Sequence, residues 1–235
     1  MKPLNSRAVS EGLESYADDL LAESTFFSAL SAGEAHPGHV RDVFGQYYLW
    51  RSRFHRWFGI CVAKSAPVDE AQCVPRVLTE LIACLRHEIK GDHQRLALSF
   101  LAALGIEDPA RIKALPVTDS YAESFLRCYS PGDRSGDEAL AALAGRGLAG
   151  PGRDRIITGA LPRHYGVTSG LEFFSPLGEE EARHSRAMWR AIIRGRRRAD
   201  AERLVEAARL EIWEHITFWD DVCYAILGME NELAS

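Results

Sequence analysis

The sequence predicts an all-α protein, and three observations support this prediction. Apolar residues recur at helical spacing along most of the 235 residues. No segment alternates apolar and polar residues with enrichment in β-branched side chains, which is the pattern of a half-buried strand. Breaks in the helical spacing coincide with glycine and proline, as in the stretch 33–38. We therefore expect helices joined by loops, and no sheet.

Long helices are expected in the first half of the chain. An amphipathic segment covers 8–31, and a strongly aromatic helix follows the glycine–proline break at 40–64. A third long helix at 71–105 ends at Gly105, just before an Asp-Pro pair. These segments have the apolar content needed for the walls of a helical bundle.

Further helices are expected in the second half, at 118–129, 137–146, 154–165, 169–194 and 199–228. The stretch 145–153 contains four glycines and a proline. Glycine and proline both disfavour the interior of a helix. We therefore expect this stretch to interrupt the helical structure.

The overall composition limits the function classes. The chain is 46% hydrophobic and 26% charged, which suits one large globular domain covering 1–235. Its net charge of −5 argues against nucleic acid as a partner, because phosphate binding needs a basic surface. No run of about 18 apolar residues predicts a membrane span. Acidic residues stand where a signal peptide needs an apolar run, so we expect a cytoplasmic protein without a membrane partner.

The five cysteines are odd in number, widely spread and without a Cys-x-x-Cys pair. Disulfides and a cysteine zinc site are therefore not expected. A catalytic thiol needs an activating environment, and the neighbours of Cys128 give no sign of one.

Three stretches, in this order, resemble the heme-oxygenase-like superfamily, which includes thiaminase II, pyrroloquinoline quinone synthase and non-heme iron oxidases. They are 26–33 with 43–48 and Phe54; 86–93 with 100–105; and 164–166 with 170–174, Glu181, His184 and Trp189. The resemblance implies an all-α bundle of about seven or eight helices around a central pocket. It does not fix the reaction, because one fold hosts many chemistries.

The resemblance also implies a candidate iron site. Iron oxidases of this superfamily combine carboxylates and imidazoles from several helices, and both groups suit iron. Position by position, Glu88 and His93 match ligands on the third helix, and Glu181 and His184 match ligands on the helix at 169–194. These four residues are the predicted metal ligands.

Two further ligand positions lack a suitable residue. Leu177 stands in place of a histidine, and Arg146 or Gly147 stands in place of a glutamate from the middle helix. A di-iron site would therefore be under-ligated, whereas a single iron with two histidines and a carboxylate remains chemically reasonable.

The pair on the third helix also has a geometric difficulty. Glu88 and His93 are five residues apart, which is about 140° around an ideal helix. Both can face one metal only if the helix is distorted near Gly91. Glu80 and His87, seven residues apart on a shared face, form a fallback pair.

Other polar residues are weaker candidates for the site. Tyr48, Arg51 and Tyr165 are predicted to bind substrate through their polar ends. Glu211 and His215 form an i, i+4 pair on the last helix. They are left out of the predicted ligand set, because the resembled family keeps few ligands there.

The leading hypothesis is an oxygen-dependent oxidoreductase that acts on a small metabolite or amino-acid-like substrate, with Fe(II) as cofactor and dioxygen as co-substrate. The first alternative is a metal-free oxidase resembling the quinone synthase, in which His87, Arg163, His164 and Tyr165 bind substrate or transfer protons. The second is a degenerate, non-catalytic partner protein. A homodimer is compatible with the sequence, which marks no interface.

Overall fold

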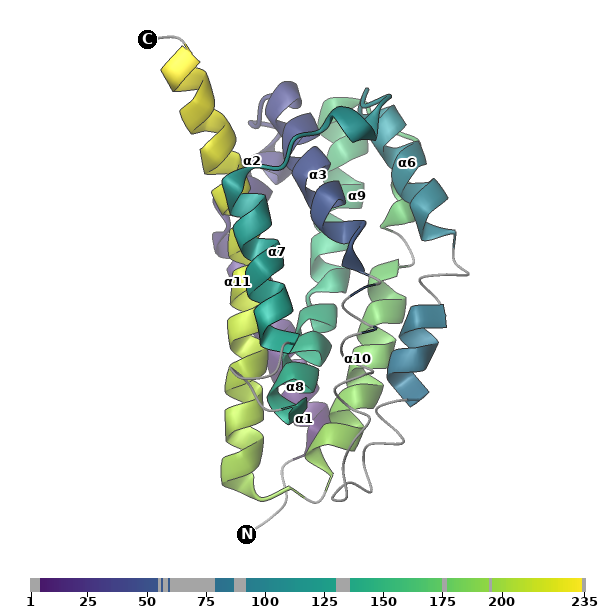
Figure 1. The fold of residues 1–235 in the computed structure, drawn as a ribbon, viewed down its shortest axis with the longest axis vertical. Helices are drawn as coiled ribbons and strands as arrows, with labels where there is room; N and C mark the ends of the chain where they lie inside the picture. The colour runs from purple at the N-terminus through teal and green to yellow at the C-terminus, as the bar shows by residue number, and fades with distance from the viewer. Residues whose placement is uncertain are drawn as a thin grey trace.

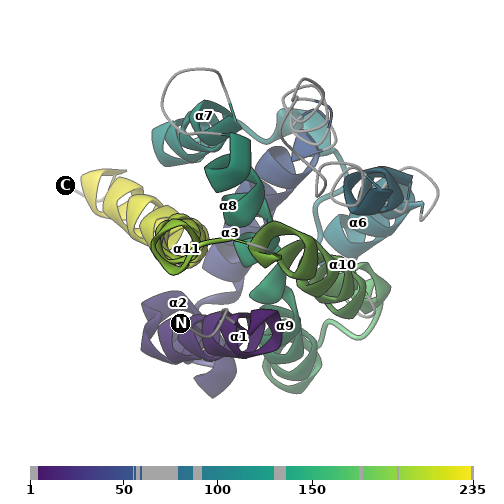
Figure 2. The same ribbon diagram turned by 90° about the horizontal axis from the view of Figure 1, so that it is seen from below.

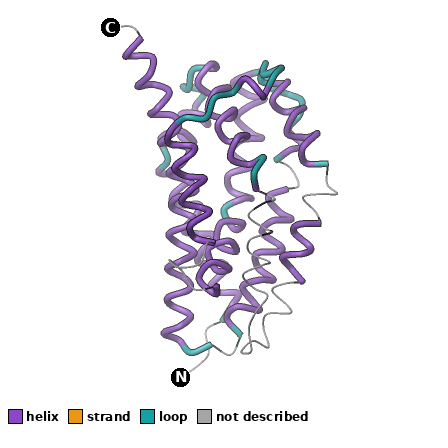
Figure 3. The backbone as a smooth tube through the Cα atoms, in the orientation of Figure 1, coloured by secondary structure: helices purple, strands orange, loops and turns teal. Residues whose placement is uncertain are grey.

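Helices run side by side along the long axis of the computed structural model, which describes residues 5–54, 56, 59, 79–86, 92–129, 136–174, 177–194 and 196–233 (Figure 1). No strand occurs in these ranges, as the tube drawing shows (Figure 3). The α-helices are α1 Ser6–Glu23, α2 Thr25–Ala32, α3 Pro37–Arg51, α6 His93–Ala103, α7 Pro116–Tyr129, α8 Gly136–Leu148, α9 Gly150–Tyr165, α10 Leu177–Ile193 and α11 Arg198–Leu233. Residues 79–86 are also helical, and short 3-10 turns lie at η1 Pro109–Arg111 and η2 Leu171–Phe173. The all-α prediction is confirmed.

The predicted helix at 8–31 is divided at Ser24. This residue is extended, and its hydroxyl accepts a hydrogen bond from the Phe27 backbone N–H, so it caps α2. The same hydroxyl donates to Asp220 Oδ1 at 2.7 Å. The break at Ser24 therefore ties the α1–α2 junction to α11.

Helix α8 lies in the middle of the bundle (Figure 2). Every residue from 139 to 150 is buried, and α8 packs most extensively against α10 and α11. A helix surrounded on all sides needs apolar residues around its whole circumference. This explains why its sequence is rich in alanine, leucine and glycine.

The interruption predicted within 145–153 is present, but it is shorter than expected. Helix α8 continues to Leu148, and α9 begins at Gly150 after a single helical-region residue, Ala149. Glycines here permit close packing: a Cβ on Gly145 would lie 2.6 Å from Ala208 Cβ, and one on Gly147 would lie 2.2 Å from Ser185 Oγ. Contact between helices therefore overrides the weak helix propensity of glycine.

No helix in the described ranges is both long and apolar enough to cross a membrane. The last turns of α11 project past the other helices and carry the C-terminus (Figure 1).

Candidate functional site

A set of polar side chains from six helices lies buried in the middle of the bundle. We call it the polar core cluster. Its members are Tyr47 and Arg51 of α3, Tyr121 of α7, Arg146 of α8, Arg153 and Asp154 of α9, Glu181 of α10, and Glu211 and His215 of α11. All are buried except Glu181, whose side chain is 13% exposed. The cluster therefore reaches accessible space at Glu181.

Two guanidinium groups lie beside the same oxygen of the Glu181 carboxylate. Arg51 Nη2 lies 3.4 Å from Glu181 Oε1, and Arg146 Nη2 lies 4.0 Å from the same oxygen. The guanidinium carbons of Arg51 and Arg146 lie 4.5 and 4.1 Å from the centre of the Phe54 ring. The Phe54 ring, just beyond the end of α3, thus supplies a surface against which both cations pack.

Arg153 and Asp154 form the second ion pair of the cluster. Arg153 Nε and Nη2 both lie 2.7 Å from Asp154 Oδ1. Burial is the largest single effect on the pKa of the Arg153 guanidinium and lowers it. The charges of Asp154, Tyr47 and Glu181, with the hydrogen bond to Asp154, together outweigh burial and raise the pKa. Burial raises the pKa of Asp154 to about 7, because lost hydration outweighs the attraction of Arg153.

His215 connects this ion pair to Tyr121. Arg153 Nη1 lies 3.1 Å from His215 Nε2, and His215 Nδ1 lies 3.0 Å from the Tyr121 hydroxyl. Because a guanidinium can only donate, Nε2 accepts, and the proton of the neutral ring is on Nδ1. Burial, with Arg146 and the other guanidiniums nearby, lowers the pKa of His215 well below its ordinary value. The ring therefore stays neutral near pH 7.

The raised pKa of Asp154 predicts an unusual pH dependence of stability. Between pH 3.8, its ordinary pKa, and about 7, the folded protein keeps a proton that the unfolded chain has lost. The contribution of this group to the free energy of unfolding therefore falls as pH rises through that window. We expect urea denaturation to show that the wild type loses stability relative to Asp154→Asn between pH 5 and pH 8.

The Asp154→Asn variant is the reference for the wild type, because asparagine does not titrate and the two proteins share all other titratable groups. Parallel stability profiles of the two proteins across this range would contradict the raised pKa.

Solved structures of other proteins resemble this whole bundle. A domain of unknown function with a heme oxygenase-like fold from Shewanella denitrificans superposes with a TM-score of 0.74 at 16% identity, covering 97% of this chain and 95% of that one. The chain has the heme oxygenase-like fold.

Two further structures agree. A TenA homolog from Pseudomonas syringae pv. tomato gives a TM-score of 0.71 at 12% identity, covering 96% of this chain and 99% of that one. Heme oxygenase-1 from Synechocystis, in complex with heme, gives 0.51 at 13% identity, covering 97% and 99%. No family model and no curated protein matches the sequence. Similarity at this level establishes the fold. The chemistry has to be inferred from the residues of this chain.

Within this heme oxygenase-like bundle, Glu181 and His184 contact different partners. Glu181 faces the guanidiniums described above. The Nδ1 atom of His184 lies 2.9 Å from Glu80 Oε2, and Nε2 lies 3.0 Å from Arg183 Nη2. Since Arg183 donates to Nε2, the lone pair that a metal would need is already used.

The described part of the predicted ligand set does not fit an iron centre. No group of three or more His, Cys, Asp or Glu side chains that could hold a metal ion occurs in the described ranges. The cationic groups of Arg51 and Arg146 also disfavour a dication at Glu181. Glu88 and His87 lie outside the described residues, and His93 is half-buried at the first residue of α6. A role for Glu88 and His93 in iron binding stays a prediction.

The three residues predicted to bind substrate lie in different surroundings in the structure. Arg51 belongs to the polar core cluster. Tyr48 packs half-buried against the apolar core, whereas its neighbour Tyr47 contacts Arg153, whose guanidinium carbon lies 5.7 Å from the ring centre. Tyr165 is twelve residues from Arg153 on α9, about 18 Å along the helix.

Several cluster members were absent from the predicted site. The sequence indicated that Glu211 and His215 lie close together, since they are i, i+4 neighbours on one face of a helix. Arg146 was noted only as an unsuitable iron ligand, although it is the only charged residue in the buried range 139–150. A charged side chain on a helix that is apolar all round is the signal that identifies such a residue.

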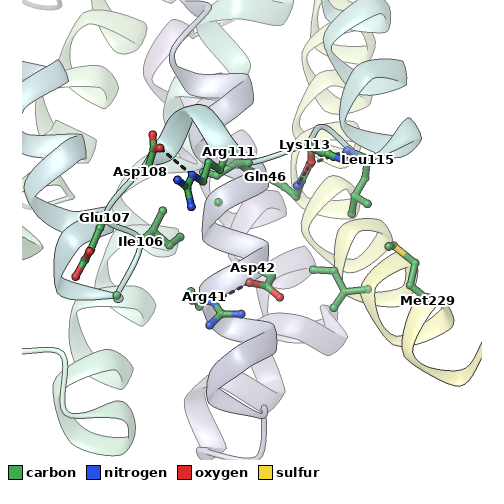
Figure 4. Close-up of a pocket in the computed structure, with 14 residues that line it drawn as sticks. Arg41, Asp42, Gln46, Ile106, Glu107, Asp108, Arg111, Lys113, Leu115 and Met229 are labelled. Carbon is green, nitrogen blue, oxygen red and sulfur yellow. Dashed lines mark hydrogen bonds and ion pairs between the residues drawn. The ribbon is translucent and has the colours of Figure 1, made fainter. Parts of the chain in front are cut away.

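A separate surface pocket of about 710 Å³ lies between α3, the η1 loop and the end of α11 (Figure 4). Its rim carries charges of both signs. Arg41 pairs with Asp42 at 2.8 Å, and Arg111 pairs with Asp108 at 3.1 Å. Gln46, at its inner wall, donates to the Lys113 carbonyl oxygen and accepts from Leu115 N–H. These polar groups already bond to one another, so we place the chemistry in the polar core cluster.

Proposed function

We propose that the protein is an oxidoreductase that oxidises a small organic molecule with dioxygen in the polar core cluster, without a metal ion bound by Glu181 or His184. The observation that carries the proposal is the contact of Glu181 with two guanidinium groups. A carboxylate held in this way is part of a site for polar organic groups.

The chain offers hydrogen-bond donors at the cluster. Arg51 and Arg146 provide guanidinium N–H groups beside Glu181, the most exposed member. Burial, with the charge of Glu211, raises the pKa of Tyr121 well above its ordinary value, so its hydroxyl stays protonated. Such fixed donors stabilise negative charge that develops on a substrate oxygen during a reaction.

His215 acts on the substrate through Tyr121. It is neutral, and its Nδ1–H donates to the Tyr121 hydroxyl oxygen, which orients the O–H of Tyr121. Arg153 fixes the tautomer of His215 from the other side of the ring. The expectation of dioxygen rests on the sequence resemblance and on a bundle whose structural neighbours include a heme oxygenase.

Oxygen uptake tests the proposal. We would incubate the protein with a panel of reduced aromatic and cyclic organic acids, after chelator treatment and again after anaerobic loading with Fe(II). We expect uptake that persists in the presence of the chelator. Turnover that requires Fe(II) would overturn the proposal and favour iron held by the predicted residues Glu88, His93, Glu181 and His184.

Replacing Tyr121 by phenylalanine tests the site itself. Loss of one donor to a developing oxyanion typically costs about 10²–10³ in kcat, so we expect a decrease of that order with the fold retained. Tyr16→Phe, on the outer helix α1, is the matched control and should keep wild-type kcat. Equal kcat values in the two variants would exclude Tyr121 from the reaction.

A further inference from the structure

Arg146 is a buried cation without adequate compensation. Its exposed fraction is 3%. The carboxylate oxygen paired with it, Glu181 Oε1, is 4.0 Å from Nη2, and Nε is buried without a partner. Buried charged groups are normally both paired and hydrogen-bonded, because desolvation is costly.

The surroundings of Arg146 match a planar acid. The guanidinium carbon lies 4.1 Å from the centre of the Phe54 ring and 5.1 Å from that of Trp50. Arg51 directs a second guanidinium toward the same carboxylate oxygen of Glu181. Two guanidiniums beside aromatic rings can bind a carboxylate and leave an apolar surface for the rest of the ligand.

We propose that Arg146 and Arg51 bind the carboxylate group of an organic acid, and that Glu181 occupies this anion site when no ligand is present. The proposal rests on the proposed function only in placing the substrate in the polar core cluster.

Glu181 is suited to such an exchange. Its 13% exposure makes it the most accessible member of the cluster, and its distances to Arg51 and Arg146, 3.4 and 4.0 Å, are longer than those of well-formed charge-assisted hydrogen bonds. A ligand carboxylate can approach both guanidiniums more closely than this tethered side chain does.

Binding of benzoate and acetate to the chelator-treated protein, measured by calorimetry and thermal unfolding at low salt, tests the proposal. Benzamide provides the same ring without the charge, and inorganic phosphate provides a different oxyanion. We expect benzoate to bind more tightly than acetate, and benzamide not to bind. Failure of both carboxylates to bind, or preferential binding of phosphate, would overturn the proposal.

Arg146→Met removes the cation and keeps an unbranched side chain. We expect benzoate affinity to fall roughly 10- to 100-fold. We also expect Tm without ligand to rise by at least about 2 °C, because an uncompensated buried charge is lost. A structural role for Arg146 predicts the opposite, a lower Tm with unchanged affinity, and this result would refute the anion site.

Two variants complete the test. Arg155→Met, on the exposed side of α9, makes the same change of charge and should leave both affinity and Tm unchanged. Glu181→Gln removes the internal competitor and should tighten benzoate binding; weaker binding in this variant would contradict the exchange. Because these readouts need no turnover, carboxylate binding without oxygen uptake would reject the proposed function and retain the anion site.

Discussion

Replacing Arg153 by methionine is expected to lower the free energy of unfolding by about 3–5 kcal/mol. The variant leaves Asp154, which is 5% exposed, without the guanidinium that contacts its Oδ1 at 2.7 Å. The other carboxylate oxygen, Oδ2, packs closely against Gly178, because a Cβ on Gly178 would lie 2.5 Å from it. Urea denaturation at pH 8, where Asp154 is ionised in the wild type, measures the loss.

The double variant Arg153→Met/Asp154→Asn is the control. It removes the stranded charge, so we expect it to be more stable than Arg153→Met alone, although each substitution made singly perturbs the pair. If the losses of the single variants simply add in the double variant, the coupling inferred from the short contact is refuted.

Replacing Gly145 by alanine should destabilise the protein by about 1–3 kcal/mol, the usual cost of overpacking. The new Cβ would lie 2.6 Å from Ala208 Cβ and 3.0 Å from Ala208 Cα and O. Backbone atoms cannot rotate away, so α8 and α11 must separate. That movement also shifts Arg146 relative to His215, because each lies on one of the two helices.

Gly159→Ala is the matched comparison. Gly159 lies inside α9, and a Cβ at this position would have no atom within 4 Å outside the backbone of its own helix. Alanine should therefore stabilise this helix by about 0.5–1 kcal/mol. Opposite signs for the two substitutions in thermal denaturation support close packing at Gly145. Equal stabilisation by both would show that α8 and α11 are not in tight contact there.

Helix positions followed from local sequence wherever the helical period was strong. The helices expected at 118–129 and 199–228 correspond to α7 and α11. The nine labelled α-helices in the described ranges exceed the seven or eight expected, since Ser24 divides the helix expected at 8–31 into α1 and α2. Single-residue breaks of this kind depend on caps and contacts that periodicity does not show.

Candidate site residues were harder to predict than helices. Glu181 and Arg51 were predicted, and the structure brings them together at 3.4 Å. They contact each other, however, as an ion pair, whereas the prediction assigned one to iron and the other to substrate. His184, three residues beyond Glu181, bonds to Glu80 instead. Spacing along one helix showed that two side chains share a face, but it did not show which neighbouring helix each would meet.

The sequence by itself determined the all-α class and most of the helices, because the 3.6-residue period is a local property of the chain. Only the tertiary structure decided that the glycine-rich stretch is helical on both sides of Ala149 and that α8 is central. It also decided that Arg146, Arg153, Asp154 and His215 meet in one cluster. The physical reason is that close packing at glycine and the pairing of buried charges depend on which helices lie side by side. That arrangement specifies the chemistry of the polar site predicted inside the bundle. Among the described residues, the site contains carboxylates that are paired with arginines.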